Sequence, residues 1–495
     1  MLNICELIFS NFDDQNINYC HWKSNEHLEA GLNGETDLDI LIDPEDKERS
    51  VDVYKQLQIL TCKSQFGSRY PNVEDYIAFD EDTGKLIHLH QHYKIVTGHT
   101  GLKEFVLPYD QVVLNTKIKD KQTGIYVIKP EAELYILYLR IVLKSYPETY
   151  RQAQKGKYKI KDDYCREIKY LKSLCTRESC QEFYKTYGFD IAMVPFIWDE
   201  ELNAESFCSL YRYVNQKLDK YSRYSPIKAE ILWNIFPNLI HCNRFIRKKL
   251  NKSILIKKSV PGKGISIAFI GQDGSGKSTI TNEIEKWFLW KMDAQRFYLG
   301  SGEHYNPWQK KCLKAVSSKK NKSVLFSYIS GMLSVSLCYS VSRYNLAQLK
   351  YARKYIAKGG IALYDRFPQT QFAGVYDGPK IRELYLKKTS NPLLRAIIAW
   401  YASREEANIA KAQKYNPDFV FKLILSIDES MRRKPENNYQ DIEQKNAITS
   451  KLVFSESEVI EVDAEQPYND ELLNIKNKIW GALFYKENSE GGNGC

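Results

Sequence analysis

Residues 265–280 carry the pattern best suited to chemistry in this chain. They read ISIAFIGQDGSGKSTI, so an apolar run leads directly into G-x-x-x-x-G-K-S. Glycines let backbone N–H groups turn around a phosphate, Lys277 can place its charge on the β- and γ-phosphates, and the Ser278 hydroxyl can ligate Mg²⁺. A helix expected at 279–290 would point its positive end at the same anion. The residues of this predicted ATP or GTP site are Gly271, Asp273, Gly274, Ser275, Gly276, Lys277, Ser278 and Thr279.

A carboxylate and a guanidinium follow a later apolar run. Asp365 and Arg366 come directly after residues 361–364. Ligands of open α/β sheets lie at the carboxyl ends of the strands. We expect Asp365 to hold Mg²⁺ through water or to orient an acceptor, and Arg366 to bind a phosphate with two hydrogen bonds. The alternative is an ordinary surface Asp–Arg pair.

A cationic cluster follows the strand expected at 419–425. Asp428 is a candidate N-cap for the next helix, which carries Arg432, Arg433 and Lys434. Three cations near a nucleotide can close over it and neutralise charge on the phosphoryl group during transfer. An ordinary solvated cluster is the alternative.

A second pattern of interest lies near the N-terminus, where residues 34–43 read GETDLDILID. Asp37 and Asp39 alternate along an expected strand, so their carboxylates share one face about 7 Å apart. This spacing lets both ligate one hard cation or a pair of them. Lys23 can support phosphates nearby, although a single lysine is weak evidence.

Length and composition describe a globular chain of more than one domain. The 495 residues exceed one typical core, and 43% of them are hydrophobic. The net charge of +10 suits polyanionic ligands such as nucleotides, but Lys and Arg are too dispersed to predict specific nucleic-acid binding. The 11 cysteines include no C-x-x-C pair, which favours reduced thiols and a cytoplasmic protein. No signal peptide is expected.

The organisation of the chain changes at several points. The predicted divisions are an α/β domain at 1–128, a helical extension at 129–250, a basic linker at 251–263, an α/β domain at 264–485 and a flexible tail at 486–495. The alternative role for this basic linker is to contact an anionic surface. The uncharged segment 323–342 is long enough to span a membrane, but its seven serines favour a buried helix.

Residues 264–485 resemble the thymidylate kinase family of nucleoside monophosphate kinases. The resemblance rests on the loop QDGSGKST, the Asp365-Arg366 pair and the Arg-Arg-Lys cluster at 432–434. It implies a P-loop parallel sheet flanked by helices, ATP as donor, Mg²⁺, and transfer of the γ-phosphate to a nucleoside monophosphate or related anionic acceptor. It also implies that Asp273 touches the sugar of the acceptor.

The sequence departs from that family where the acceptor binds. The family has an Arg-Glu-Pro type segment after its second strand, whereas residues 297–303 read FYLGSGE and contain no arginine. Residues 367–379 also differ from the usual thymidine pocket. We therefore expect phosphotransfer, but these segments do not predict dTMP as the acceptor. Chains of this variant type resemble thymidylate-kinase-like proteins associated with bacterial surface polysaccharides.

The Asp37/Asp39 pattern resembles the nucleotidyltransferase fold of the DNA polymerase β superfamily. The resemblance implies Mg²⁺ bound beneath a triphosphate, and it requires a third carboxylate on a neighbouring strand. The strand expected at 86–96 offers His88, His90 and His92 on one face instead. Imidazoles suit a softer ion such as Mn²⁺ or Zn²⁺. A degenerate nucleotide site and an unrelated polar strand face are the alternatives.

The sequence thus predicts a P-loop kinase unit fused to a mixed α/β domain with a helical extension. Lys277, Asp365, Arg366, Arg432 and Arg433 are the predicted catalytic residues. The predicted cofactors are ATP and Mg²⁺, and the predicted partners are a nucleotide, a small-molecule acceptor and a second copy in a homodimer. Two rival functions are nucleotidyl transfer by the N-terminal site to a sugar, lipid or protein, and a nucleotide-gated binding protein with little turnover.

Overall fold

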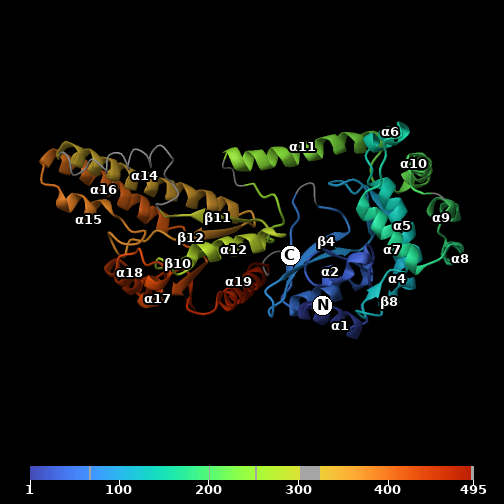
Figure 1. Ribbon diagram of the computed structural model, residues 1–495, viewed down its shortest axis with the longest axis horizontal. Coiled ribbons are helices and arrows are strands. Elements are labelled where there is room, and N and C mark those ends of the chain that lie inside the picture. Colours follow the sequence, from blue (N-terminus) through green and yellow to red (C-terminus); the bar gives the residue numbers. More distant parts are fainter. Residues whose placement is uncertain (66–68, 200, 251–253, 301–323, 492–495) are drawn as a thin grey trace. The chain divides into compact units, whose positions relative to one another are not determined.

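The computed structural model describes residues 1–65, 69–199, 201–250, 254–300 and 324–491. The chain divides into two compact units, Met1–Phe245 and Ile246–Cys495. The division falls within helix α11 (Pro226–Leu250), slightly before the basic linker expected from the sequence (Figure 1).

Within the described residues, the C-terminal unit is built on a five-stranded parallel sheet. Its strands are β10 (Ser266–Gly271), β11 (Ala294–Tyr298), β12 (Ile361–Asp365), β13 (Phe419–Ile424) and β14 (Glu458–Asp463). They lie in the order β11-β12-β10-β13-β14, and each neighbouring pair is parallel. The carboxyl ends of all these strands therefore meet at one edge. The predicted parallel sheet is confirmed.

Helices flank this sheet (Figure 1). They are α12 (Lys277–Leu289), α14 (Val324–Ile356), α15 (Ile381–Leu384), α16 (Pro392–Gln413), α17 (Ile427–Arg433), α18 (Tyr439–Lys451) and α19 (Tyr468–Gly491). Ala268 and Ile270 of β10 pack into one apolar cluster with α14 and α18. The intervening Phe269 stacks on Phe421 of β13. Because both faces are covered, the whole of β10 is buried.

Two helix ends differ from the sequence prediction. The side chain of Ser426 accepts a hydrogen bond from the backbone N–H of Glu429, so Ser426, and not Asp428, is the N-cap of α17. Helix α19 continues to Gly491 and so includes the start of the predicted tail, while 492–495 lie outside the described residues.

The uncharged segment for which a membrane span was weighed belongs to α14, apart from its first residue. This helix packs along α16. In the described part of the chain, none of the helices combines the length and apolar character that a membrane crossing requires.

Part of the basic segment before β10 packs onto the C-terminal unit through Asp293. This carboxylate is buried and accepts hydrogen bonds from the backbone N–H groups of Ile256 and Lys257 and from Arg247 Nη1, the last at 2.7 Å. Burial of a carboxylate is tolerated where several donors satisfy it. Arg247 is therefore bound to a buried partner instead of being solvated.

The N-terminal unit has a seven-stranded mixed sheet in the part of the chain that the structure describes. Its strands are β1 (Tyr19–His21), β2 (Leu38–Ile42), β3 (Leu60–Cys62), β4 (Val73–Phe79), β5 (Leu86–His92), β8 (Ile118–Lys119) and β9 (Tyr126–Val127). The order is β3-β4-β5-β2-β1-β9-β8, and β6 (Ile95–Thr97) pairs separately with β7 (Phe105–Leu107). Short helices accompany the sheet: α1 (Asn3–Asp14), α2 (Leu28–Leu32), α3 (Lys47–Gln56) and α4 (Asp110–Thr116).

The two faces of this sheet differ in character. Residues such as Ile40 and Leu89 pack into an apolar core with α1 and α3. Side chains alternate along a strand, so the residues next to these apolar ones, such as Asp39 beside Ile40 and His90 beside Leu89, lie on the opposite face. Asp39 of β2 is level with His90 of β5, which is level with Asp75 of β4. Strand register thus forms a polar row across three strands.

A helical layer completes the N-terminal unit. It consists of α5 (Pro130–Leu143), α6 (Pro147–Gln154), α7 (Asp162–Leu174), α8 (Arg177–Tyr187), α9 (Val194–Trp198) and α10 (Ala204–Leu218). Helix α5 is buried along most of its length in a large apolar cluster. The predicted mixed α/β architecture with a helical extension is confirmed, whereas its likeness to nucleotidyltransferases stays a prediction.

Candidate active site

The loop between β10 and α12 turns sharply at two glycines. Gly274 and Gly276 adopt φ angles of 92° and 82°, in the left-handed region that disfavours a Cβ. The Ser430 hydroxyl of α17 donates to the Asp273 carbonyl at 2.7 Å and ties the loop to that helix. Helix α12 begins directly after Gly276, so its unpaired N–H groups and positive dipole end face the loop. This arrangement suits a bound phosphate.

The side chain of Lys277 folds back over the loop. Its Nζ donates to the Gln272 carbonyl at 2.6 Å and lies 3.5 Å from Ser275 Oγ. Burial, aided by repulsion from Arg366, lowers the pKa of the ammonium to about 7. An anionic phosphate in the loop would favour the charged form and raise this pKa. By contrast, Ser278 and Thr279 are exposed in the first turn of α12.

This lowered pKa predicts that ATP binding weakens as pH rises above about 7. Without a bound anion, Lys277 loses its proton above that pH. The protein must therefore take up a proton when it binds ATP. The Kd for ATP should then rise by at most about tenfold per pH unit. Calorimetry in EDTA, with buffers of different ionisation heats, measures both the Kd and the proton uptake. A Lys277→Ala variant should lack the uptake, and a flat wild-type profile would contradict this prediction.

Asp365 ends β12 as a buried carboxylate with one oxygen paired. Its Oδ2 accepts from Arg296 Nη2 of β11 at 2.7 Å. Its Oδ1 has no hydrogen-bond partner among the described residues. A buried carboxylate oxygen without a partner at this edge fits a ligand to Mg²⁺, directly or through water. Arg296 escaped the sequence analysis because it immediately precedes the segment 297–303.

Arg366 connects the end of β12 with the loop. Its φ of 73° is uncommon for a residue with a Cβ, and such strained positions cluster at functional sites. Arg366 Nη2 lies 3.4 Å from Asp273 Oδ1, and Lys445 of α18 pairs with the other oxygen of Asp273. Burial opposes ionisation of Asp273, but the Lys445 hydrogen bond and the nearby charges of Lys277 and Arg366 outweigh it and lower the carboxyl pKa.

The cationic cluster of α17 divides between the loop and solvent. Arg433 Nη1 lies 3.4 Å from the Gly274 carbonyl, so this residue reaches the loop. Arg432 is 75% exposed and pairs with Glu429, as Arg433 does through its Nε. Hydrogen bonds from both arginines lower the pKa of Glu429 to about 2. Lys434 follows the end of the helix.

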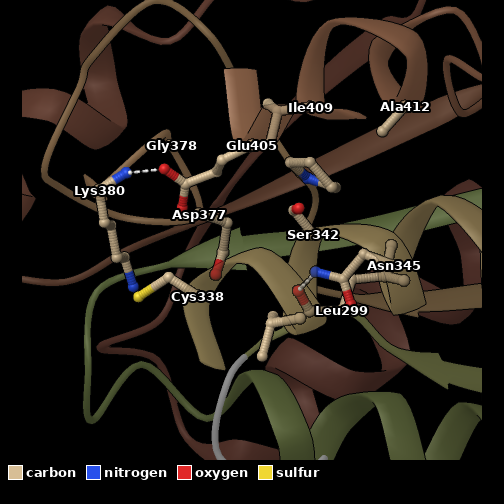
Figure 2. Close-up of a pocket in the computed structure, with 12 residues that line it drawn as sticks. Leu299, Cys338, Ser342, Asn345, Asp377, Gly378, Lys380, Glu405, Ile409 and Ala412 are labelled. Carbon is tan, nitrogen blue, oxygen red and sulfur yellow. Dashed lines mark hydrogen bonds between the residues drawn. The ribbon is translucent and has the colours of Figure 1, made fainter. Parts of the chain in front are cut away.

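A cavity of about 110 Å³ lies beside the ends of β11 and β12 (Figure 2). Its lining is formed by Leu299, Cys338, Val341, Ser342, Asn345, Pro368, Asp377, Gly378, Lys380, Glu405, Ile409 and Ala412. Asn345 Nδ2 donates to the Leu299 carbonyl at 2.6 Å, whereas its buried Oδ1 has no hydrogen-bond partner in the described part of the chain. Glu405 Oε2 accepts from the N–H groups of Lys380 and Ile381, at 3.0 and 2.8 Å. Leu299, Pro368, Asp377 and Gly378 lie in the two segments where the sequence departs from the thymidylate kinase family, whereas the lining residues of α14 and α16 carried no signal in the sequence.

Asp377 links this cavity to the loop. It lines the cavity, and its carboxyl pKa is raised by burial, against the attraction of Arg366, Lys380 and Lys277. Asp377 also gives the largest electrostatic contribution that holds the pKa of Arg366 above its ordinary value, against the effect of burial. A residue that lines the cavity, Asp377, therefore interacts electrostatically with Arg366 at the predicted phosphate site.

The Asp37/Asp39 region forms a second polar site, in the N-terminal unit. Asp39 Oδ1 contacts Lys23 Nζ at 2.7 Å, His90 Nδ1 at 3.0 Å and His92 Nε2 at 3.3 Å. Burial opposes ionisation of Asp39, but these partners keep its pKa well below the ordinary value. Burial lowers the pKa of His90 to about 4 and that of His92 well below its ordinary value.

Asp37 contacts His88, whose other ring nitrogen contacts Asp75. The Nδ1 of His88 lies 2.8 Å from Asp37 Oδ1, and its Nε2 lies 2.9 Å from Asp75 Oδ1. Asp75 is a buried carboxylate that the sequence analysis missed, because only the pairing of β4 with β5 brings it here. Imidazoles thus lie between the three carboxylates Asp37, Asp39 and Asp75.

Curated relatives align with less than half of the chain, and no family model matches it. The "Uncharacterized ATP-binding protein YghR" of Escherichia coli K12 is 28% identical over 218 residues, which are 42% of this chain and 83% of that protein. The "Uncharacterized ATP-binding protein YghS" of the same strain is 25% identical over 232 residues, 44% of this chain and 93% of that protein.

Solved structures with some likeness include deoxyadenosine kinase from M. mycoides. Its complex with dCTP has a TM-score of 0.26 and 18% identity, and its complex with dATP has 0.27 and 17%. Each alignment covers 43% of this chain and 98% of the kinase chain. Similarities this distant carry no conclusion about substrate.

Proposed function

We propose that the C-terminal unit is an ATP-dependent phosphotransferase that moves the γ-phosphoryl group of ATP to a small acceptor. The observation that carries the proposal is the meeting of Lys277, Asp365 and Arg366 around one loop, beside a cavity whose lining is mostly apolar with a few polar groups. The two Escherichia coli relatives described as ATP-binding support ATP as the nucleotide.

Each group has a role in this proposal that follows from its position. The loop N–H groups and Lys277 bind the β- and γ-phosphates. Ser278 and Asp365 would hold Mg²⁺, which neutralises phosphate charge when bound. Arg366 orients the transferred group, and Arg433 stabilises it from α17. Since phosphoryl transfer depends mostly on positioning and electrostatic stabilisation, these groups suffice without a covalent intermediate.

The cavity supports an acceptor whose enclosed end is neutral and rich in hydrogen-bond donors. Asn345 Oδ1 and the carboxylates of Asp377 and Glu405 are acceptors, so they complement N–H or O–H groups such as those of an amino-bearing base or a sugar. An anionic group on the acceptor would need to face Arg366 or Lys380. This lining does not itself favour dTMP, because thymine presents only one N–H donor.

An acceptor panel tests the proposed function. The full chain with Mg²⁺-ATP is incubated with neutral nucleosides, nucleoside monophosphates and sugar phosphates, and ADP and phosphorylated product are measured by mass spectrometry. We expect at least one amino-bearing nucleoside or nucleotide to yield a phosphorylated product with equimolar ADP. ADP release that no acceptor stimulates would contradict the proposal and favour a nucleotide-gated binding protein.

Replacing Asn345 should weaken acceptor binding specifically. Asn345→Ala removes the amide oxygen, so the KM for the acceptor should rise about tenfold, as expected for the loss of one hydrogen bond. The KM for ATP should change little, because Asn345 lines the cavity and not the loop. Asn416→Ala, outside this cavity, is the control. Equal effects of both variants on the acceptor KM would exclude the cavity as the acceptor site.

Nucleotidyl transfer by the N-terminal unit is a second candidate function. The contact between Asp39 and Lys23 favours it, because a carboxylate that can hold a cation and an ammonium that can pair with a phosphate then lie 2.7 Å apart. Transfer of the α-phosphoryl group of an α-labelled nucleotide to an added sugar, lipid or protein would be the expected activity. Asp39→Asn should remove this transfer and Lys277→Ala should spare it, whereas the reverse result would exclude the candidate.

A further inference from the structure

Two imidazoles and one carboxylate converge on the polar face of the N-terminal sheet. Nitrogen atoms of His90 and His92 and a carboxylate oxygen of Asp39 all lie within 4.8 Å of one another. The strands fix this arrangement, because Asp39 pairs in register with His90, and Leu41 pairs with His92. The three ligand atoms therefore come from two adjacent strands and not from a mobile loop.

Contacts behind these side chains hold the imidazoles in orientation. The ring of His92 packs edge-on against Trp22, with centroids 5.1 Å apart, and the ring of His90 lies 4.6 Å from that of His92. The second nitrogen of His90 faces Asp75 Oδ1 at 3.8 Å. Metal-bound histidines are commonly oriented by a carboxylate near the second ring nitrogen. A cation would therefore meet ligands that are already positioned.

The site is open enough for an ion to enter. The His92 side chain is fully buried, whereas those of Asp39 and His90 are 13% and 14% exposed. The Lys23 side chain is 15% exposed and supplies the positive charge beside Asp39, with Nζ 2.7 Å from Oδ1. Because this ammonium lies on the same oxygen, an entering cation would displace it toward solvent.

From this geometry we infer that Asp39, His90 and His92 form a binding site for a divalent first-row transition-metal ion. Two nitrogen ligands and one oxygen ligand suit Zn²⁺, Co²⁺, Ni²⁺ or Mn²⁺, whereas Mg²⁺ prefers all-oxygen sites. His88 lies between Asp37 and Asp75. His90 lies between Asp39 and Asp75, so Asp75 is separated by an imidazole from each of the other two carboxylates. The inference is independent of the phosphotransfer proposed for the C-terminal unit.

Metal titration of the full chain tests this inference. After chelator treatment and dialysis, Co²⁺ alone is added and followed by visible absorption, and Zn²⁺ by calorimetry. We expect one ion per chain at this site, with d–d bands typical of nitrogen and oxygen ligands and no thiolate charge-transfer band. A thiolate band, or displacement of Co²⁺ by Mg²⁺ at comparable concentration, would overturn the inference. Because this measurement uses the unaltered chain, it does not depend on the folding of a variant.

Matched variants assign the ion to these residues. His90→Ala and His92→Ala each remove a ligand, so each should weaken Zn²⁺ binding by about 100-fold or more, the upper end of what loss of a group behind a ligand costs. His241→Ala removes an exposed histidine of α11 and should leave binding unchanged. Lys23→Gln removes the competing ammonium, so Zn²⁺ should bind at least as tightly. Wild-type affinity in both His90→Ala and His92→Ala, or loss of binding in Lys23→Gln, would refute the site.

Discussion

Replacing Lys277 with alanine should reduce phosphoryl transfer by about 100- to 1000-fold, as removal of one preorganised charge at a developing anion typically does. The Lys277 amine lies buried in the loop, where it donates to the Gln272 carbonyl and lies 3.5 Å from Ser275 Oγ; neither of these partners is an anion, so a bound phosphate would supply the missing negative charge. Initial rates of product formation with saturating ATP measure the effect. Thermal melting should show no loss of stability, because the variant removes a buried amine whose charged form is poorly solvated.

A second lysine of α12 provides the control for this prediction. Lys286 lies on the same helix, but it is exposed and pairs with Glu283. Lys286→Ala should retain wild-type rates within about twofold, as expected for an exposed ion pair worth little energy. If Lys277→Ala also retained wild-type rates, the loop would not be the seat of phosphotransfer.

Breaking the pair between Arg296 and Asp365 should destabilise the C-terminal unit by about 3–5 kcal/mol. Asp365 is fully buried, and Arg296 is 17% exposed, so Arg296→Met leaves a carboxylate in the interior without its partner. Urea denaturation of the full chain measures the loss. The transition of the C-terminal unit is identified by its shift to higher urea when ATP is added.

The double variant separates an ion pair from simple packing. Arg296→Met combined with Asp365→Asn should be less destabilised than Arg296→Met alone, because no uncompensated charge then remains. If the double variant lost as much stability as the two single variants together, the side chains of Arg296 and Asp365 would not be coupled. A change below about 0.5 kcal/mol in Arg296→Met, as for a surface substitution, would contradict the importance of the pair.

The loop and the end of β12 could be located from sequence because their signals are local. Gly274 and Gly276 adopt positive φ angles that explain the glycines of the motif, and Asp365 directly follows a short apolar run. The parallel sheet could be predicted as well, since apolar strands alternate with helices across the unit. All these features can be recognised from residues that are close together in the sequence.

The partners of these residues could not be predicted, because tertiary packing brings them together. Arg296 is one of two polar residues on β11, Lys445 is one of several charged residues on α18, and Asn345 is one of many polar residues scattered along α14. Nothing in their local sequence distinguishes them from solvated side chains. Asp75 is similar, because only strand register places it beside His90.

A single turnover with γ-labelled ATP tests the central claim most directly. The full chain is mixed with substoichiometric labelled ATP and Mg²⁺, the acceptor found in the panel is added, and the label is followed over one turnover. The proposed phosphotransfer predicts that the label appears in the acceptor product, at a rate that Lys277→Ala lowers by about 100-fold or more. Label that stays in ATP, or that appears only as inorganic phosphate whether or not the acceptor is present, would contradict it.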